Sequence, residues 1–423
     1  MKKHLILAVF ALSSSAAIAT DVAVQQDVFG QPLKITASGS RFAGAIFSLT
    51  YRGKEYINTS DHGRELQSAS SFDGFGECFN PTEAGSSADS SKQTSSSALI
   101  SAYGSGGVLH TSTNMAFWLL PGQAYGKNCG STSYTSAQNT TVLSGHVLSK
   151  TVSIGYQGIP NLIRYQVSFG VAEAHKSAVF EVVTGYMPPD FSEFLTYDPV
   201  SRTLNRVSDG PGEQPRPVIL ATADGRNAMG VISLDLPQAK YPNIGYGRFR
   251  FPDTTKWNCV FREGSIAAGA TQNYECFIAV GTVNEVMVAE NSLLASTTKP
   301  APLFRFYNGR DHFITASFNE AASAGYRFEG TAFHVYPTAI DGGMISLYRC
   351  YTTTGDHFVS KSQSCEGTRY EGRYGYVSQY ARPGFQPLYR LFNPLVGDHL
   401  ITTNAQEGLD NGYHMEETLG YVN

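Results

Sequence analysis

The sequence has few charged residues and no long hydrophobic run. Asp, Glu, Lys and Arg make up only 16% of the 423 residues, and the formal net charge is −4. A chain with so little positive charge lacks the basic surface of a nucleic-acid-binding protein and has little electrostatic attraction for membranes. Its apolar runs are shorter than the roughly 20 residues of a membrane-spanning helix. We therefore expect no nucleic-acid partner and no membrane span.

Short motifs of well-known enzyme classes are absent as well. The sequence contains no Gly-x-Ser-x-Gly, no phosphate-binding Gly-x-x-x-x-Gly-Lys, no His-Glu-x-x-His and no dinucleotide fingerprint. It also has no Cys-x-x-Cys pair. We expect neither a cofactor nor a metal ion, since the ligand spacings that would bind them are missing.

Glycine and aromatic residues, in contrast, are abundant, with 42 Gly, 24 Tyr and 25 Phe. Together with short alternating runs between turn residues, this composition indicates an all-β protein. The clearest runs before the last third of the chain span residues 33–37, 45–51, 142–154, 163–169, 178–184, 218–221, 228–234 and 274–280. They predict one large β-sandwich over residues 20–296, with the serine-rich segment 84–101 as a surface loop. Residues 297–301 are interpreted as a linker.

The first residues have the order of a secretory signal peptide. Lys2 and Lys3 precede the apolar run Leu5–Leu12, and the small residues Ala17-Ile18-Ala19 follow. This order predicts a signal peptide over residues 1–19 with cleavage before Thr20. We therefore expect a secreted or periplasmic protein.

The six cysteines form an even set in a chain that we expect to be exported, so disulfides are favoured over metal or thiol chemistry. Six cysteines allow 15 connectivities. Pairing in sequence order keeps every bridge inside one expected domain. We therefore predict the bridges Cys78–Cys129, Cys259–Cys276 and Cys350–Cys365.

The last part of the chain repeats one pattern three times, over residues 302–423. The pieces of this pattern are Leu303-Phe304-Arg305, Leu347-Tyr348-Arg349 and Leu388-Tyr389-Arg390, then Asp311-His312-Phe313, Asp356-His357-Phe358 and Asp398-His399-Leu400, then Gly-led segments from 325, 367 and 412. The histidines are separated by 45 and 42 residues. A period of this size is typical of repeats whose units cannot bury their apolar faces alone.

Each repeat offers about four short strand-like pieces, and only Phe318–Ala324 and Asn404–Asp410 favour a helical turn. Three copies of four strands suit closure into a threefold barrel, because closure removes unpaired strand edges. We predict a β-trefoil of three repeats of ~42 residues. The pattern resembles a secreted repeat domain of unknown function that is often appended to extracellular hydrolases. This resemblance implies an accessory role at glycans or cell surfaces.

Two interpretations of the repeated polar residues stay open. In the first, equivalent pockets bind a glycan through Arg305, Asp311, His312, Arg349, Asp356, His357, Arg390, Asp398 and His399. In the second, each His is buried and oriented by its neighbouring Asp or by a backbone carbonyl, so that it only stabilises the repeat. A catalytic site is rarely present in three copies, and no Cys or second His lies at ligand spacing within a repeat.

A group of polar residues also follows the first strands of the chain. Phe42–Ile57 alternates around the turn Arg52-Gly53-Lys54, and Asp61-His62-Gly63-Arg64-Glu65-Leu66-Gln67 comes next. This order of Gly-Ala, hairpin and Gly-Arg-x-Leu-Gln resembles the opening of galactose-mutarotase-like β-supersandwich proteins. That fold is shared by sugar epimerases and by domains of polysaccharide lyases and glycosidases. The resemblance implies a supersandwich-like domain.

The same group supplies candidates for a saccharide site. Two of the carboxylates among Asp73, Glu77 and Glu83 would act as acid and base, and His62 would transfer protons. Binding candidates are Arg64, Gln67, Asn80, His110 and Trp118. The structural alternative makes Asp61-His62-Gly63 a tight turn, Arg64 a bridge between strands and Trp118 a core residue.

These observations leave two functional hypotheses. The first is an exported carbohydrate-interacting protein, with the trefoil binding glycan and the sandwich acting as a glycoside hydrolase, polysaccharide lyase or epimerase-like enzyme. The second is a non-catalytic adhesin or envelope-associated binding protein. The expected partner in both is a polysaccharide or cell-surface glycan.

Overall fold

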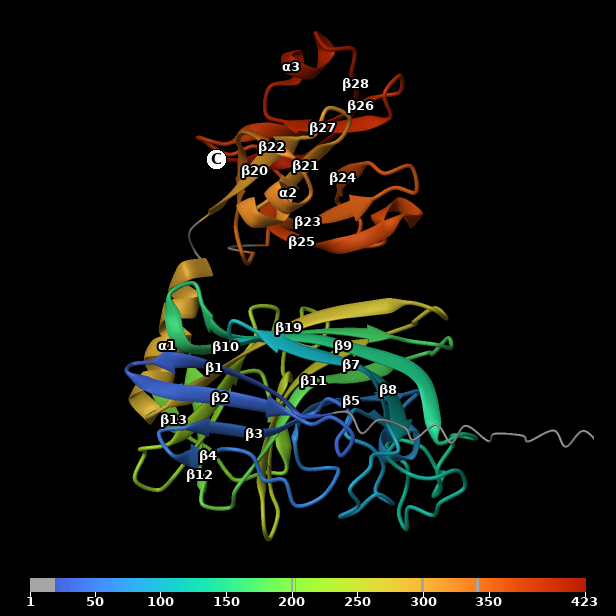
Figure 1. Cartoon of the computed structure of the whole chain (residues 1–423), viewed down its shortest axis with the longest axis vertical. Helices are drawn as coiled ribbons and strands as arrows, with labels where there is room; N and C mark the ends of the chain where they lie inside the picture. The colour runs from blue at the N-terminus through green and yellow to red at the C-terminus, as the bar shows by residue number, and fades with distance from the viewer. Residues whose placement is uncertain (1–19, 199–200, 202, 298–299, 340–341) are drawn as a thin grey trace, which may run out of the picture. The chain divides into compact units, whose positions relative to one another are not determined.

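The computed structural model describes residues 20–198, 201, 203–297, 300–339 and 342–423. The expected signal peptide and part of the expected linker lie outside these residues. The chain divides into two compact units, one ending at Glu290 and one beginning at Asn291. We call them the N-terminal unit and the C-terminal unit (Figure 1).

The N-terminal unit contains two runs of antiparallel strands. The first run, in order of pairing, is β7 (Ala98–Ser105), β8 (Val108–Phe117), β9 (Leu143–Tyr156), β10 (Ile159–Gly170), β19 (Thr271–Gly281), β16 (Ala228–Ile232), β15 (Val218–Ala221), β12 (Glu193–Asp198) and β13 (Thr203–Arg206). The second is β1 (Val22–Val28), β2 (Gln31–Ala37), β3 (Ile46–Tyr51), β5 (Leu66–Phe72), β11 (Ala178–Met187), β18 (Thr255–Glu263), β17 (Tyr246–Arg250) and β14 (Gly212–Gln214). The short β4 (Lys54–Glu55) pairs with β3, and β6 (Pro81–Thr82) connects β5 to β8.

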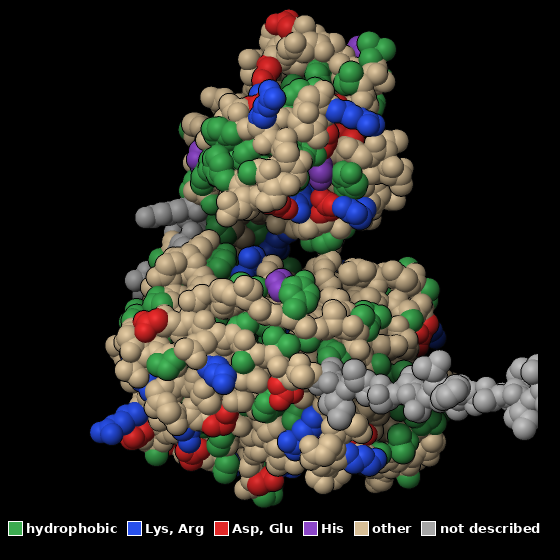
Figure 2. All heavy atoms as spheres, viewed as in Figure 1, with side chains coloured by type: hydrophobic (Ala, Val, Ile, Leu, Met, Phe, Trp, Pro, Cys, Tyr) green, Lys and Arg blue, Asp and Glu red, His purple; other side chains and the backbone are tan. Residues whose placement is uncertain are grey.

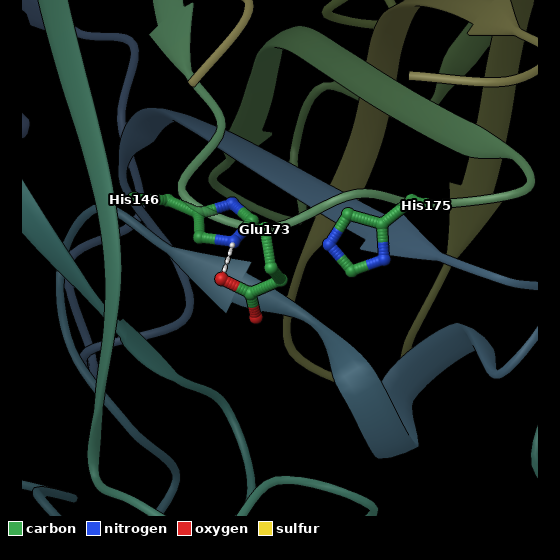
Figure 3. Close-up of side chains that lie close together, drawn as sticks. All are labelled: His146, Glu173 and His175. Carbon is green, nitrogen blue, oxygen red and sulfur yellow. Dashed lines mark ion pairs between the residues drawn. The ribbon is translucent and has the colours of Figure 1, made fainter. Parts of the chain in front are cut away.

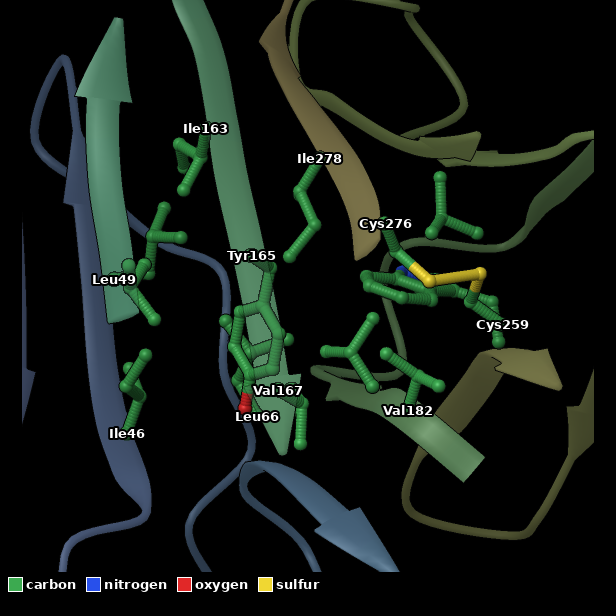
Figure 4. Close-up of a cluster of buried hydrophobic side chains, with 14 of the residues drawn as sticks. Ile46, Leu49, Leu66, Ile163, Tyr165, Val167, Val182, Cys259, Cys276 and Ile278 are labelled. Atoms are coloured by element: carbon green, nitrogen blue, oxygen red, sulfur yellow. A yellow bond between two sulfur atoms is a disulfide. The ribbon is translucent and has the colours of Figure 1, made fainter. Parts of the chain in front are cut away.

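The hydrophobic core draws side chains from both runs. Tyr165 on β10, Leu49 on β3 and Leu66 on β5 are fully buried in one cluster (Figure 4). The Cys259–Cys276 disulfide joins β18 to β19 and therefore crosslinks the two runs. Alternate residues of β9 are buried, as expected for a strand with one face against a core. The two runs thus pack face to face as a large sandwich.

Several sequence predictions are confirmed. All eight predicted strands are present in the N-terminal unit, with ends shifted by a few residues. The three predicted disulfides, Cys78–Cys129, Cys259–Cys276 and Cys350–Cys365, are all formed. The turn at Arg52-Gly53 joins β3 to β4, and both residues have positive φ, as a tight two-residue hairpin requires.

Segment 84–101 differs from the predicted surface loop because its first part is buried. Asp89 Oδ2 accepts hydrogen bonds from the backbone amides of Ser86 and Ser96, and Asp89 is only 5% exposed. Serine-rich composition indicated a solvated segment, but a buried carboxylate that accepts amide hydrogens folds the loop back onto the unit. The segment ends inside β7.

The helix α1 (Val283–Thr297) was not predicted. Its start has the features of a capping box, because Thr282 Oγ1 accepts from the Glu285 amide and Glu285 accepts from the Thr282 amide. No Gly or Pro interrupts residues 283–297. The helix packs on β16, where a Cβ at Gly230 would lie 2.5 Å from Glu290 and 2.8 Å from Val286. Glycine at 230 therefore allows the close approach of the helix.

Within its described residues, the C-terminal unit has three strands in each repeat. They are β20 (Ala301–Tyr307), β21 (His312–Thr315) and β22 (Arg327–Val335), then β23 (Met344–Tyr351), β24 (His357–Ser360) and β25 (Arg369–Ser378), then β26 (Gln386–Asn393), β27 (Asp398–Thr402) and β28 (His414–Val422). A helical turn separates the last two strands of each repeat, namely α2 (Phe318–Ser323), η2 (Cys365–Gly367) and α3 (Ala405–Leu409). The predicted helical turns in the first and third repeats are therefore confirmed.

Each repeat has three strands where the sequence predicted about four. In the third repeat the expected pieces 413–415 and 419–422 form the single strand β28. The pairing of β26 with β28 shifts register twice, and such bulges absorb extra residues without ending the strand. One core cluster contains equivalent residues from all three repeats, such as Leu303, Leu347 and Leu388. The larger sheet is a curled half-barrel, so closure into a trefoil stays a prediction.

Among the described residues, no helix has the length and apolarity needed to span a membrane. On the face shown in Figure 2, acidic and basic side chains are interspersed, and neither sign covers an extended patch.

Candidate functional site

The outer face of the second strand run carries a group of polar side chains. Lys256 on β18 is paired with Tyr186 on β11 and with Phe249 on β17. Directly paired residues of antiparallel strands project to the same side of a sheet. The next residue, Trp257, is buried in the core cluster. Because neighbours along a strand alternate between faces, Lys256, Tyr186 and Phe249 project away from the core.

Lys256 is the centre of this group. Its Nζ lies 3.0 Å from Glu181 Oε2, 4.9 Å from the Tyr186 ring centroid and 5.2 Å from the Phe249 ring centroid. Asn258, two residues along β18, also interacts with Glu181. A Cβ at Gly247 would lie 2.1 Å from Asn258 Oδ1, so this position requires glycine. We call Glu77, Glu181, Tyr186, Phe249, Lys256 and Asn258 the Lys256 cluster.

Glu181 and Lys256 form a charged pair. Burial opposes both charges, but the attraction between the two groups outweighs the effect of burial. This attraction lowers the pKa of Glu181 and raises the pKa of Lys256. Both side chains are therefore ionised at neutral pH.

Glu77, at the start of the short helix η1 (Gly76–Phe79), behaves in the opposite way. Burial raises the pKa of Glu77, and the charge on Glu181 raises it further, although Lys256 and Lys127 act against this shift. Two carboxyl groups that influence one another thus have pKa values displaced in opposite directions. Such a pair provides a proton donor and a proton acceptor at the same pH.

Aromatic side chains flank the cluster. Tyr186 is roughly parallel to Phe251, with 6.5 Å between ring centroids and an interplanar angle of 25°. Phe251 is 41% exposed. Aromatic faces beside ionisable groups can pack against the apolar face of a sugar ring while the polar groups contact its hydroxyls.

Of the other predicted catalytic residues, Glu83 is fully buried in the core. Its Oε1 lies 2.5 Å from Lys150 Nζ, and its Oε2 accepts from the Ser68 amide. Burial raises the pKa of Glu83 and lowers the pKa of Lys150. With both side chains 0% exposed, the pair has no contact with solvent in which a substrate would arrive.

His62 is also buried, with both ring nitrogens occupied. Its Nδ1 lies 2.7 Å from the Ser90 carbonyl and its Nε2 lies 2.7 Å from the Arg41 carbonyl. A ring with two carbonyl partners has no free position for a substrate proton. His62 therefore connects two loops.

The predicted binding residues of the N-terminal unit lie at several places. Arg64 pairs with Asp253 and Asp61. Gln67 Oε1 accepts from the Ala84 amide at 2.9 Å, whereas Asn80 lies beside Glu77. His110 stacks on Tyr103, and Trp118 packs near the Cys78–Cys129 bridge. Of this set, only Asn80 makes a contact with the Lys256 cluster.

In the C-terminal unit, every Asp-His pair is formed between repeats. His312 Nδ1 lies 2.6 Å from Asp398 Oδ2, His357 Nδ1 lies 2.7 Å from Asp311 Oδ2, and His399 Nδ1 lies 2.6 Å from Asp356 Oδ2. The second oxygen of each Asp accepts the backbone amide of the same His. We call this cyclic arrangement the Asp-His ring.

The repeated arginines form a second cycle in the same direction. The helical-turn residues Glu407, Glu320 and Glu366 pair with Arg305, Arg349 and Arg390, each from a different repeat, at 2.6, 2.9 and 2.7 Å. Each Arg also pairs with a Glu of its own repeat, namely Glu329, Glu371 and Glu416. We interpret both cycles as connections between repeats, because the charged groups proposed for glycan binding already have partners within the protein.

The Asp-His ring predicts a pH dependence. Burial opposes a charge on His357, but hydrogen bonds with Asp311 and Glu371 outweigh it and raise its pKa from 6.5 to about 9. Because its pKa is higher in the folded state, protonated His357 stabilises the fold. This stabilisation is fully present below the unfolded-state pKa of 6.5 and is lost as the pH rises through about 9. We expect the urea midpoint of the C-terminal unit to be lower at pH 9 than at pH 6. Tyrosine near-UV circular dichroism follows both units, and tryptophan fluorescence identifies the part of the transition that belongs to the N-terminal unit.

The variant His357→Gln provides the control for this prediction. It removes the titrating group, so the midpoint should depend less on pH between the same two values. Equal midpoints of the unmodified protein at both pH values would contradict the assigned role of His357. Both tryptophans, Trp118 and Trp257, lie in the N-terminal unit, so their fluorescence reports that unit separately.

Sequence reasoning missed Glu181, Tyr186 and Lys256. A signal was present for Glu181, which is the one charged residue of β11, and Lys256 directly precedes the aromatic Trp257. Such a residue lies on the face opposite the core. Its partner on another strand depends on strand pairing, which the sequence leaves open.

Comparisons with known proteins give the following similarities. Residues 286–368 and 363–423 match the family described as a domain of unknown function (DUF5648). No curated protein matches the sequence. The structure is similar to a galactose mutarotase related enzyme from Lactobacillus acidophilus, with 9% identity, 62% of this chain and 97% of that chain covered, and a TM-score of 0.34.

Two further solved structures show similarity at the same level. A galactose mutarotase-like protein from Lactobacillus casei has 9% identity, coverage of 61% of this chain and 99% of that chain, and a TM-score of 0.33. A heparan sulfate lyase mutant from Pedobacter heparinus has 8% identity, coverage of 74% of this chain and 42% of that chain, and a TM-score of 0.33. At TM-scores this low, the function has to be inferred from the chain's own residues.

Proposed function

We propose that the Lys256 cluster is the active site of a carbohydrate-active enzyme that cleaves a glycosidic bond. The observation that carries this proposal is the pair of carboxyl groups, Glu77 and Glu181, whose pKa values are shifted in opposite directions around one lysine. Glycoside cleavage needs a protonated and an ionised carboxyl group at one bond. Tyr186 and the exposed Phe251 provide aromatic faces for a sugar ring.

In the proposed reaction, Glu77 donates its proton to the glycosidic oxygen as the bond to the sugar carbon breaks. Glu181, as the carboxylate, either removes a proton from an attacking water molecule or attacks the sugar carbon directly. Lys256 keeps Glu181 ionised, so that the carboxylate can stabilise the positive charge that develops on the sugar carbon.

The test is turnover by the full-length protein on a panel of neutral and acidic polysaccharides. Release of reducing ends without an unsaturated product supports hydrolysis. An unsaturated product, detected by its ultraviolet absorbance, would assign the same two residues to proton abstraction and leaving-group protonation in a lyase. Absence of any product from the whole panel contradicts the proposal.

Conservative substitutions at the two carboxyl groups should reduce turnover strongly. Glu77→Gln and Glu181→Gln each remove one proton-transfer group, and such groups contribute about 10²–10⁴-fold to the rate. Activity of the unmodified protein should fall as the pH rises through the raised pKa of Glu77, because only its protonated form donates a proton. Initial rates measured across pH at saturating polysaccharide check both expectations.

Glu275→Gln is the matched control for these variants. Glu275 lies on β19 of the other strand run and pairs with Arg164 at 2.5 Å. Its loss should leave the rate within about twofold, since paired surface carboxylates contribute little. A loss of activity in this control equal to that in Glu181→Gln would point to a general structural effect.

A non-catalytic glycan-binding protein is the second candidate, and one feature of the C-terminal unit favours it. Phe318 and Phe328 are 46% and 51% exposed, and they pack with Phe304 at centroid distances of 4.8 to 6.0 Å. Exposed aromatic clusters of this kind are suited to stacking on sugar rings. Polysaccharide binding that is lost in Phe328→Ala while Glu181→Gln binds normally, without turnover of any substrate, would favour this candidate.

We further propose that the protein functions outside the cytoplasm. Three disulfides and no free cysteine are expected in an oxidising compartment, where such bridges persist. Mass spectrometry of the mature protein, recovered from medium or periplasm, should show an N-terminus at Thr20.

A further inference from the structure

A second cluster of titratable side chains shares no residue with the Lys256 cluster. His146, Glu173 and His175 each offer one ligand atom, and these atoms all lie within 4.8 Å of one another. His146 Nε2 is 3.3 Å from Glu173 Oε2 (Figure 3). Both histidines are buried, whereas the Glu173 side chain is 47% exposed. The cluster is therefore open to solvent on the glutamate side only.

The backbone fixes these three residues. His146 lies near the start of β9, and Glu173 and His175 lie in the connection between β10 and β11. The backbone of this connection bonds to the segment 266–270 at both ends, through Val171 with Ala270 and Gly269 and through His175 with Ile266. Such a connection holds its side chains in place before any ligand binds.

His175 presents an unused nitrogen toward the other two residues. His175 Nδ1 lies 2.9 Å from Asp73 Oδ2, and Asp73 Oδ1 accepts the Lys176 amide at 2.7 Å. This carboxylate fixes the tautomer of His175, so that Nε2 carries the lone pair. His146 Nε2 faces Glu173 Oε2 at 3.3 Å, whereas Nε2 of His175 is buried without a hydrogen-bond partner among the described residues. A buried polar nitrogen without a partner is costly, which indicates that something else satisfies it.

We propose that His146, Glu173 and His175 bind a divalent transition-metal ion, with Zn²⁺ the best match. Two imidazole nitrogens and one carboxylate oxygen are the donor set of open zinc sites, in which a fourth position takes water or substrate. An orienting carboxylate behind a histidine ligand is also typical of such sites, and Asp73 occupies that position.

The experiment is a titration of the metal-free full-length protein with ZnCl₂, followed by calorimetry and native mass spectrometry. We expect one Zn²⁺ per chain in the unmodified protein. His175→Ala and His146→Ala should abolish this binding, and Glu173→Gln should weaken it while keeping the fold, because the glutamate side chain is half exposed. Asp73→Asn should lower the affinity about 10–100-fold through the orientation of His175.

Co²⁺ provides a second readout, since its visible spectrum reports the coordination geometry. His414→Ala is the control, because His414 is exposed in the C-terminal unit and should leave stoichiometry and affinity unchanged. Circular dichroism of every variant separates loss of a ligand from loss of folding. Absence of Zn²⁺ binding by the unmodified protein, or unchanged affinity in folded Glu173→Gln and Asp73→Asn, would overturn the proposal.

Discussion

Replacing Lys150 with Met is expected to destabilise the N-terminal unit by about 3–5 kcal/mol, although the change removes a charged group from an apolar core. Lys150 projects inward from β9, where its neighbours on the same face, Leu148 and Val152, are core residues. Its Nζ lies 2.5 Å from Glu83 Oε1, and both side chains are 0% exposed. Without Lys150, the Glu83 carboxylate would be buried with no opposite charge.

The destabilisation in Lys150→Met comes from the unpaired Glu83 carboxylate, so removing that carboxylate as well should restore stability. The double variant Glu83→Gln/Lys150→Met leaves no charge at this position of the core, so it should be considerably more stable than Lys150→Met alone. The penalty of the single variant should also decrease at lower pH, where the isolated Glu83 becomes protonated more readily. Urea unfolding followed by tryptophan fluorescence reports this unit, since both tryptophans lie in it. A single-variant loss below about 1 kcal/mol, as for an exposed pair, would contradict this account.

Local sequence patterns predicted most of the N-terminal fold. Alternating runs such as Ala178–Thr184 correspond directly to strands like β11, because alternation reflects one buried face. The helix α1 was missed despite the signal Thr282-x-x-Glu285, because residues 286–289 form a short continuous apolar run. Short apolar segments do not distinguish helix from strand by period alone.

The candidate sites were harder to predict because each depends on strand pairing. Glu83 and Glu77 are close in sequence, yet one faces the core and the other faces the outer cluster. Sequence position gives no indication of this difference. His146 and His175 are far apart along the chain and meet only because β9 and β10 pair as a hairpin. For this reason spacing rules did not predict a metal site.

The threefold repeat shows the same limit on a larger scale. The sequence indicates that Asp and His recur together, and adjacency suggests that they pair within one repeat. Neighbouring residues in an extended chain project in opposite directions, so the side chains of Asp398 and His399 do not face one another. Each instead bonds to the adjacent repeat, as in Asp398 with His312. Repetition in the sequence predicts the strands of each repeat. The contacts between repeats depend on how the repeats pack against one another.

Removal of Asp398 should therefore destabilise the C-terminal unit more than removal of the equivalent Asp356. Asp398 is fully buried, bonds to the His312 ring and backbone amide, and also accepts the Tyr413 hydroxyl. Asp356 has the matching contacts with His399, but Thr368 stands where the third repeat has Tyr413. A hydrogen bond to a charged group contributes about 1.5–3 kcal/mol. We expect Asp398→Ala to cost more than Asp356→Ala by about this amount.

Hydrogen exchange of peptides from residues 300–423 measures this difference without interference from the N-terminal unit. The background variant Tyr413→Phe is the internal control, because it removes only the hydroxyl that distinguishes the two sites. In that background Asp398→Ala and Asp356→Ala should have nearly equal costs, and Asp311→Ala, whose carboxylate accepts the Tyr326 hydroxyl at 2.5 Å, should remain the more costly change. If Asp356→Ala equals Asp398→Ala in the unmodified background, the tyrosines contribute nothing and the Asp-His pairs alone connect the repeats.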